Sequence, residues 1–216
     1  FITTGSSKGG MAALIACGGD PRIVGSYPTA WNSGNLLEFT RLKGQRWGWN
    51  VKPKQTGPAG MTAAESMRTF ATPRSQEDRR LFDPHEWHGL LEGKFVMPAV
   101  GTNDPLFHLL SDQFYYEKLA CKKALLRVPN YPHGRTSPQH AKAWRFAVAA
   151  ALLDRPVPTV TLEARPEGDG HEIFASISNA SRAKRLAIHS TSDPTGDYRK
   201  SKWRTNEVAI PEDLSR

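Results

Sequence analysis

The stretch FITTGSSKGGMAALIACGG, residues 1–19, decides the fold. Its first four residues are typical of the end of a β-strand, Gly5 to Gly10 predict a tight turn, and Met11 to Cys17 predict a short buried helix. A strand, the sequence G-x-S-x-G and a helix, in that order, form the pattern of a nucleophile elbow. We expect this strained turn to project the Ser7 hydroxyl outward. We expect glycines on both sides of the serine because side chains there would collide with neighbouring backbone.

Two other interpretations of this turn are an ordinary strand-to-helix connection and a phosphate-binding loop. A phosphate-binding loop of the common kind needs G-x-x-x-x-G-K-[ST], which the sequence lacks. In the catalytic interpretation Ser7 is the nucleophile, and Gly5 and Gly9 shape the elbow. The backbone N–H of Lys8, at the start of the helix, then points towards an oxyanion and gains from the helix dipole.

A serine hydrolase built on such an elbow also needs an acid and a histidine, each after a later strand. Asp104 follows the predicted strand Lys94–Val100, and His133 follows the predicted strand Ala124–Val128. Asp112 is a rival acid, but a carboxylate in the first turn of a helix predicted over about 111–119 is explained by capping. Asp104 and His133 also have simpler interpretations as turn and loop residues. The order along the chain favours Ser7 as nucleophile, Asp104 as acid and His133 as base.

The rest of the chain divides into a turn-rich region and a β-rich region. From about residue 31 to 93 the pattern weakens, and we interpret this stretch as an insertion or lid with a helix near Thr62 to Ala71. Its tryptophans can line a substrate pocket or pack in the core. Ser137-Pro138 predicts the start of a further helix. Beyond residue 155 we expect short antiparallel strands, with a hairpin turn at Gly168-Asp169-Gly170.

Composition excludes some function classes and leaves others open. The 216 residues carry 29 Lys and Arg against 21 Asp and Glu, a net charge of +8. These bases are scattered, so we do not expect nucleic acid as a partner, although a basic binder of anionic surfaces and a non-catalytic binding protein remain alternatives. No apolar run approaches the roughly 20 residues that span a bilayer. The two cysteines have no metal-ligand spacing, and no metal or cofactor is expected.

Four blocks of sequence resemble one known family. They are GSSKGGMAALIACGGDPRIVGSYP (5–28), FDPHEW (82–87), GTNDPLFHLLSDQFYYEKL (101–119) with KKALLRVPNYPHG (122–134), and, faintly, residues 191–203. The family is that of the PhoPQ-activated pathogenicity-related proteins, a branch of the α/β-hydrolases. The resemblance implies the same roles for Ser7, Asp104 and His133, a small ester or peptide substrate, and a secreted or periplasmic location.

The chain departs from this family at two points. The family usually has Lys-Arg-Gly after the serine, whereas this chain has Lys8-Gly9-Gly10, which is more similar to the elbow of certain secreted serine tripeptidyl aminopeptidases. The family's Asp-Glu-Phe-Phe is Asp104-Pro105-Leu106-Phe107 here. Neither departure removes a predicted catalytic residue, and both ester and peptide substrates stay open.

The predicted fold is the C-terminal part of an α/β-hydrolase parallel sheet with flanking helices, followed by a small antiparallel β domain. We place a partial catalytic domain at 1–154 and a small, truncated β-sandwich-like domain at 155–216. Because the chain begins at the elbow, we expect earlier strands and the second oxyanion donor upstream. A sheet that lacks them exposes an edge and apolar surface, so we expect these 216 residues alone to be inactive or prone to aggregate.

Overall fold

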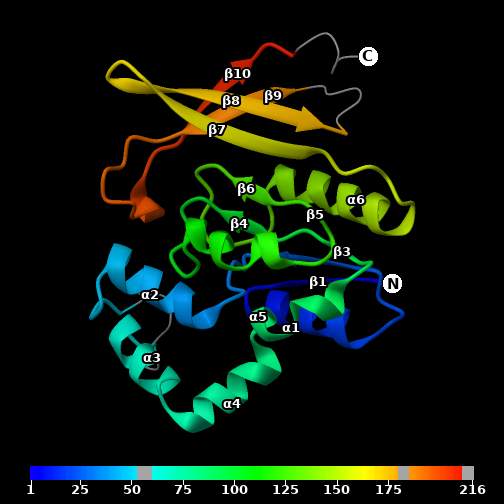
Figure 1. The fold of residues 1–216 in the computed structure, drawn as a ribbon, viewed down its shortest axis with the longest axis vertical. Helices are drawn as coiled ribbons and strands as arrows, with labels where there is room; N and C mark the ends of the chain where they lie inside the picture. Colours follow the sequence, from blue (N-terminus) through cyan, green and yellow to red (C-terminus); the bar gives the residue numbers. More distant parts are fainter. Residues whose placement is uncertain (53–59, 180–184, 211–216) are drawn as a thin grey trace.

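A parallel sheet forms the centre of the computed structural model, which describes residues 1–52, 60–179 and 185–210 (Figure 1). Parts of the predicted insertion (53–59) and of the predicted β domain (180–184 and 211–216) lie outside the described residues. Every pairing in this sheet is parallel, in the order β5-β3-β2-β4-β6 with β1 paired to β2. The strands are β1 (Ile2–Ser6), β2 (Gly25–Thr29), β3 (Phe95–Val96), β4 (Ala99–Gly101), β5 (Lys122–Lys123) and β6 (Leu126–Val128).

The strand predicted over residues 94–100 is present, but it is divided into β3 and β4. Between them Met97 N–H donates to Ser26 O at 3.0 Å, and Pro98 O accepts from Leu126 N–H at 2.9 Å. Proline has no N–H to add to the ladder, so the chain continues in the same direction with one bond missing. β3 and β4 thus act as one strand, and the predicted fold class is confirmed for the sheet.

Helices cover both faces of the sheet, as predicted. On one face α6 (Pro138–Leu152) packs its alanines against Tyr27, Phe95 and Met97. On the other face α1 (Lys8–Gly19) buries Leu14 and Cys17 in a cluster that includes Val96. Phe95 and Val96 are consecutive residues on opposite faces, which is the alternation expected of a strand buried on both sides.

The predicted insertion is helical. It contains α2 (Leu36–Trp47), α3 (Ala63–Phe70), α4 (Pro73–Phe82), α5 (Pro84–Trp87) and the 3-10 helix η2 (His88–Leu91). α3 confirms the helix expected near Thr62, whose side chain forms a capping box with Glu65. Asp83 ties the two ends of this region together, because its Oδ2 accepts from the Leu36 N–H at 2.8 Å and its Oδ1 from the His85 N–H at 3.2 Å. Among the described residues, no helix is both long and apolar enough to cross a membrane.

The helix predicted over about 111–119 is present as two short helices and not as one. The chain forms two 3-10 helices there, η3 (Leu109–Phe114) and η4 (Tyr116–Lys118). Tyr115 separates them with φ −141°. Its buried ring packs 5.5 Å from that of Trp31, and its hydroxyl donates to Asn32 Oδ1 at 2.8 Å. This packing holds the backbone of Tyr115 away from helical angles.

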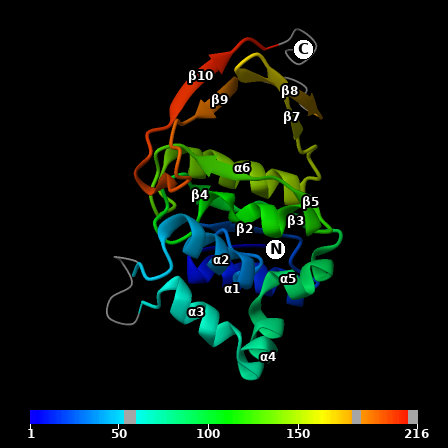
Figure 2. The ribbon, with the colours of Figure 1, turned by 60° about the vertical axis from the view of Figure 1, so that its left-hand side comes forward.

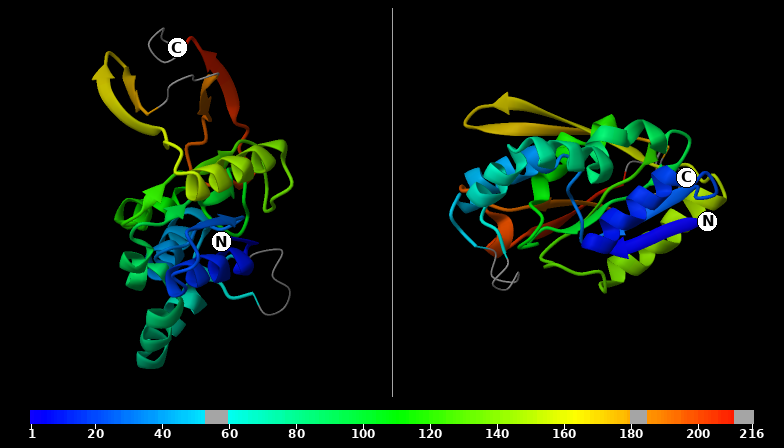
Figure 3. Two further views of the ribbon diagram at one scale, coloured as in Figure 1. Left: turned by 90° about the vertical axis from the view of Figure 1, so that its right-hand side faces the viewer. Right: turned by 90° about the horizontal axis from the view of Figure 1, so that it is seen from below.

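The C-terminal part of the chain forms two separate antiparallel pairs on the α6 side of the molecule, at the end opposite α3 and α4 (Figures 1 and 2). β7 (Thr159–Glu167) pairs with β8 (Gly170–Ser178), and β9 (Leu186–Ser190) pairs with β10 (Arg204–Val208). The predicted hairpin turn is confirmed, with Gly168 at φ +54°. The two pairs diverge from each other (Figure 3, left). The domain boundary near residue 155 stays a prediction.

Candidate active site

Ser7 lies at the turn where β1 ends and α1 begins. Its backbone has φ +56° and ψ −122°, a conformation that non-glycine residues rarely adopt. Its N–H donates to Thr29 O at 2.9 Å, which carries the hydrogen bonding of β1 and β2 one residue beyond the strand. Such strain persists only where the surrounding structure enforces it and is concentrated at functional sites. The predicted elbow geometry is therefore present at Ser7.

The two predicted elbow glycines differ in how tightly they are packed. A Cβ at Gly5 would lie 2.1 Å from Gly9 O, so this position accepts only glycine. A Cβ at Gly9 would meet nothing within 4 Å, and the expectation that a side chain there collides with backbone is wrong. Gly9 lies on the exposed side of the first turn of α1, whereas Gly10 is buried. A Cβ at Gly10 would lie 2.9 Å from that of Trp31, so Gly10 is the second glycine that packing requires.

Asp104 and His133 are joined by a hydrogen bond. Asp104 Oδ2 lies 2.8 Å from His133 Nδ1, and the carboxylate side chain is fully buried. Asp104 Oδ1 accepts from the N–H groups of Leu106 at 2.8 Å and Phe107 at 3.0 Å. Asp104 is thus a turn residue and the partner of His133 at once, with one oxygen for each role.

The environment of His133 favours its charged form. The hydrogen bond with Asp104 raises the pKa of His133 above 6.5, partial burial opposes this shift, and the negative charge of Asp104 adds to it. The ring lies parallel to that of Phe107, with centroids 5.9 Å apart and an angle of 14° between the planes. Nδ1 is committed to Asp104, so Nε2 is the nitrogen left for chemistry. In the described part of the chain, Ser7 Oγ forms no hydrogen bond with His133.

The loops that carry Asp104 and His133 are bonded to each other. Asn103 N–H donates to Tyr131 O at 3.1 Å, and Asn130 N–H donates to Thr102 Oγ1 at 2.9 Å. A Cβ at Gly101 would lie only 2.0 Å from Tyr131 O. Glycine at position 101 therefore permits the close approach that holds the acid and the histidine in register.

Asp112, the rival acid, has a different partner. Its Oδ2 pairs with the guanidinium of Arg127 on β6. In the part of the chain that the structure describes, Asp112 has no bond to His133. The capping explanation placed Asp112 in a helix start, and it does lie in η3, but its ion pair with Arg127 is the contact that occupies it.

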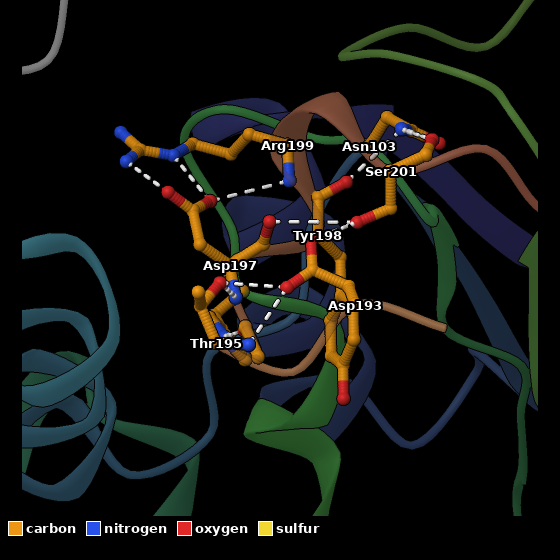
Figure 4. A network of polar contacts seen from close by, with 9 residues as sticks. Asn103, Asp193, Thr195, Asp197, Tyr198, Arg199 and Ser201 are labelled. Atoms are coloured by element: carbon orange, nitrogen blue, oxygen red, sulfur yellow. Dashed lines mark hydrogen bonds and ion pairs between the residues drawn. The ribbon is translucent and has the colours of Figure 1, made fainter. Parts of the chain in front are cut away.

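Residues 193–203, which we call the docking segment, cover these loops, a placement that the faint family resemblance over residues 191–203 did not predict. Asn103 Nδ2 donates to Tyr198 O at 3.0 Å and to Ser201 O at 2.7 Å (Figure 4). Asn130 Nδ2 donates to Trp203 O, and Trp203 N–H donates back to Asn130 Oδ1, both at 2.8 Å. The asparagines next to the predicted catalytic loops thus anchor a part of the chain from beyond β9. The sequence signals for this contact were the asparagine directly before Asp104 and the faint resemblance over residues 191–203.

The docking segment is also bonded internally. Asp193 accepts from the Thr195 N–H at 2.9 Å and from the Ser201 hydroxyl at 2.6 Å, and Asp197 forms a two-pronged pair with Arg199 at 2.7 and 2.5 Å (Figure 4). These bonds place Arg199 beside the loop of Asp104. Among the described residues, no group of three or more His, Cys, Asp or Glu side chains is arranged to hold a metal ion.

A strained serine between a strand and a helix, with an aspartate and a histidine paired after later parallel strands, defines the α/β-hydrolase fold class. The chain belongs to the family described as PhoPQ-activated pathogenicity-related protein, whose model matches residues 1–199. No curated protein matches the sequence.

Three solved structures illustrate the similarity. Acetyl xylan esterase 1 from Thermoanaerobacterium sp. JW/SL YS485 is 17% identical with a TM-score of 0.44, over 68% of this chain and 44% of its own. The acetyl xylan esterase from Paenibacillus sp. R4 is 19% identical with a TM-score of 0.43, over 68% and 43%. An esterase from Pyrococcus furiosus is 18% identical with a TM-score of 0.41, over 71% and 52%. This chain thus spans about half or less of the length of these proteins.

Proposed function

We propose that this protein is a serine hydrolase that cleaves an ester or amide bond through an acyl-serine intermediate. The observation that carries the proposal is the buried hydrogen bond of 2.8 Å between Asp104 and His133. These two residues lie on loops that follow strands of the parallel sheet, and the strained Ser7 follows another strand of the same sheet. A buried carboxylate that orients an imidazole is the arrangement that a general base needs.

The proposed reaction uses each of these groups in turn. His133 donates its Nδ1–H to Asp104, which leaves Nε2 free to accept the proton of the Ser7 hydroxyl. Ser7 Oγ attacks the carbonyl carbon, and the Lys8 N–H, at the first position of α1, stabilises the oxyanion. His133 then gives its proton to the leaving alcohol or amine. Water, deprotonated by His133 in turn, releases the acid and restores Ser7.

The Lys8 N–H is suited to this role by its place in the helix. The first N–H groups of an α-helix have no partner within it. In the described residues the Lys8 N–H donates no hydrogen bond, and the helix dipole adds a favourable field for an anion. The single donor is one half of an oxyanion hole, and a second donor has to come from another loop.

A fluorophosphonate probe tests the proposal on the full-length protein, because Ser7 Oγ attacks its phosphorus and displaces fluoride. We expect the wild type to be labelled and Ser7→Ala not to be. Ser6→Ala, one residue earlier at the end of β1, is the matched control and retains labelling. Equal labelling of wild type and Ser7→Ala would move the nucleophile elsewhere. An unlabelled wild type would favour the non-catalytic alternative.

A further inference from the structure

A small pocket lies beside the loop of Asp104 and is lined by parts of the chain that are far apart in sequence. Among the described residues, its walls come from α2 and the stretch after it, from the start of α3, from the acid loop and from the docking segment. The residues that matter here are Lys43, Trp47, Pro105 and Arg199. Pro105 directly follows Asp104, so the pocket borders the candidate active site.

Lys43 brings a positive charge to this pocket, and its ammonium lies over two aromatic rings. Its Nζ lies 5.0 Å from the centroid of Phe39 and 5.3 Å from that of Trp47. Within the described residues, it forms no ion pair and donates no hydrogen bond. Burial lowers the pKa of Lys43 to about 8, while the charge of Asp104 opposes that shift and the charge of Arg199 adds to it. Lys43 is thus a desolvated cation that feels both charges.

The groups around Lys43 are hydrogen-bond donors as well. The guanidinium of Arg199 lies 4.7 Å from the ring centroid of Trp47, and Asp197 occupies its Nε and Nη2. Among the described residues, the Nε1 of Trp47 is buried and has no acceptor. A buried N–H without an acceptor is costly, and an ammonium without a counter-ion adds to that cost. An anion in this pocket would lie beside the ammonium of Lys43 and supply the counter-ion.

A stack of aromatic rings connects the pocket to the candidate general base. The ring of Phe107 stacks with that of His133, with centroids 5.9 Å apart, and with that of Phe39, with centroids 5.7 Å apart. Lys43 lies over the outer member of this stack. A substrate whose reacting carbonyl sits at His133 can therefore extend along these rings and place a second group at Lys43.

From this arrangement we propose that the pocket of Lys43, Trp47 and Arg199 binds a carboxylate of the substrate, so that the protein prefers esters or amides that carry an acidic group. This inference rests on the proposed hydrolase function. The competing role for the same charge is one in which Lys43 acts through Asp104 and His133 and not on the substrate. The two roles predict different responses to the charge of the substrate.

Two esters with the same leaving group separate these roles. Mono(4-nitrophenyl) dodecanedioate carries a free carboxylate at the end of an acyl chain long enough to pass from His133 along Phe107 and Phe39 to Lys43, and its methyl ester is the neutral counterpart with the same acyl chain. At neutral pH we expect the full-length wild type to show a kcat/KM for the acidic ester at least tenfold above that for the neutral one, which corresponds to about 1.4 kcal/mol. This comparison needs no variant.

Substitutions then assign the preference to Lys43. Lys43→Met should lower the ratio of the two kcat/KM values about tenfold or more, and Lys43→Arg should restore most of it. Arg41→Met is the matched control, because Arg41 lies on the same helix and loses the same charge but is exposed and paired with Glu38. Its ratio should change less than about twofold, since surface charges contribute little.

Two results would overturn this inference while leaving the hydrolase intact: a wild type without preference for the acidic ester, or equal losses on both esters in Lys43→Met. The second result assigns the charge of Lys43 to the acid and the histidine. If the wild type hydrolyses neither ester, or if Ser7→Ala hydrolyses them as fast as the wild type does, the proposed function itself has failed.

Discussion

The substitution Asp104→Asn tests the role of the acid without changing its shape. Oδ1 of Asp104 accepts from two backbone N–H groups, so an amide at this position must keep its oxygen there. Its NH₂ group then faces His133 Nδ1 in place of Oδ2, 2.8 Å away. Because two donors cannot bond to each other, the imidazole has to move its proton to Nε2. Nε2 is then unable to accept a proton from Ser7.

The size of the expected loss follows from this change of tautomer. A hydrolase with its histidine in the wrong tautomer loses roughly 10³–10⁴-fold in kcat, or about 4–5.5 kcal/mol of transition-state stabilisation. The pKa of His133 should fall below its wild-type value, since the hydrogen bond and the charge of Asp104 both raise it and partial burial remains. The bond to Asp104 is charge-assisted and buried, so we also expect a loss of about 1–3 kcal/mol in the free energy of unfolding.

Two measurements check this prediction independently. Initial rates on 4-nitrophenyl esters report kcat, and NMR of the imidazole nitrogens reports the tautomer and pKa of His133 whether or not the protein turns over. A variant that keeps more than a tenth of the wild-type rate, or a His133 pKa that does not move, would refute the reasoning about the buried pair.

Other perturbations give smaller but distinct signals. Gly5→Ala should destabilise the fold by about 1–3 kcal/mol because its Cβ would overlap Gly9 O. Gly9→Ala should stabilise the fold by about 0.4–1 kcal/mol because its Cβ meets no neighbour. Urea unfolding should therefore give changes of opposite sign in the free energy of unfolding of the two variants. Asn103→Ala removes two bonds to the docking segment and should speed tryptic cleavage within residues 193–203 at least roughly fivefold; an unchanged rate contradicts this anchoring role. Since only neutral imidazole accepts a proton and the pKa of His133 is raised above 6.5, kcat/KM should rise with pH through that raised value. A profile that is level from about pH 5 to 8 would argue against His133 as the base.

The elements that carry the candidate triad were predictable because their signals are local. Ser7 directly follows β1, Asp104 and His133 lie on the loops that follow β4 and β6, and parallel strands bring their carboxyl ends to one edge of the sheet. The break at Pro98 and the 3-10 helices around Tyr115 were not predictable, since they depend on partners elsewhere in the fold. Tertiary packing overrides local preference in such places.

The pocket beside the acid loop could not be predicted from any window of sequence. Lys43 lies on a helix without a motif, and Arg199 belongs to a segment that Asn103 and Asn130 anchor from 95 and 73 residues earlier in the chain. β10 was missed because its five residues are all exposed and show no apolar alternation. Gly9 was assigned a packing role that belongs to Gly10, since the motif does not report which side of the first turn of α1 faces the sheet.

The anchoring of the docking segment has a consequence for protein synthesis. A chain leaves the ribosome from its N-terminus, so the loops of Asp104 and His133 emerge before the segment that covers them. Asn130 meets its partner Trp203 only 73 residues later, a delay of roughly 4–15 s at about 5–20 residues per second. A translation product that stops before residue 198 carries the acid and the histidine but leaves the side-chain amides of Asn103 and Asn130 in water.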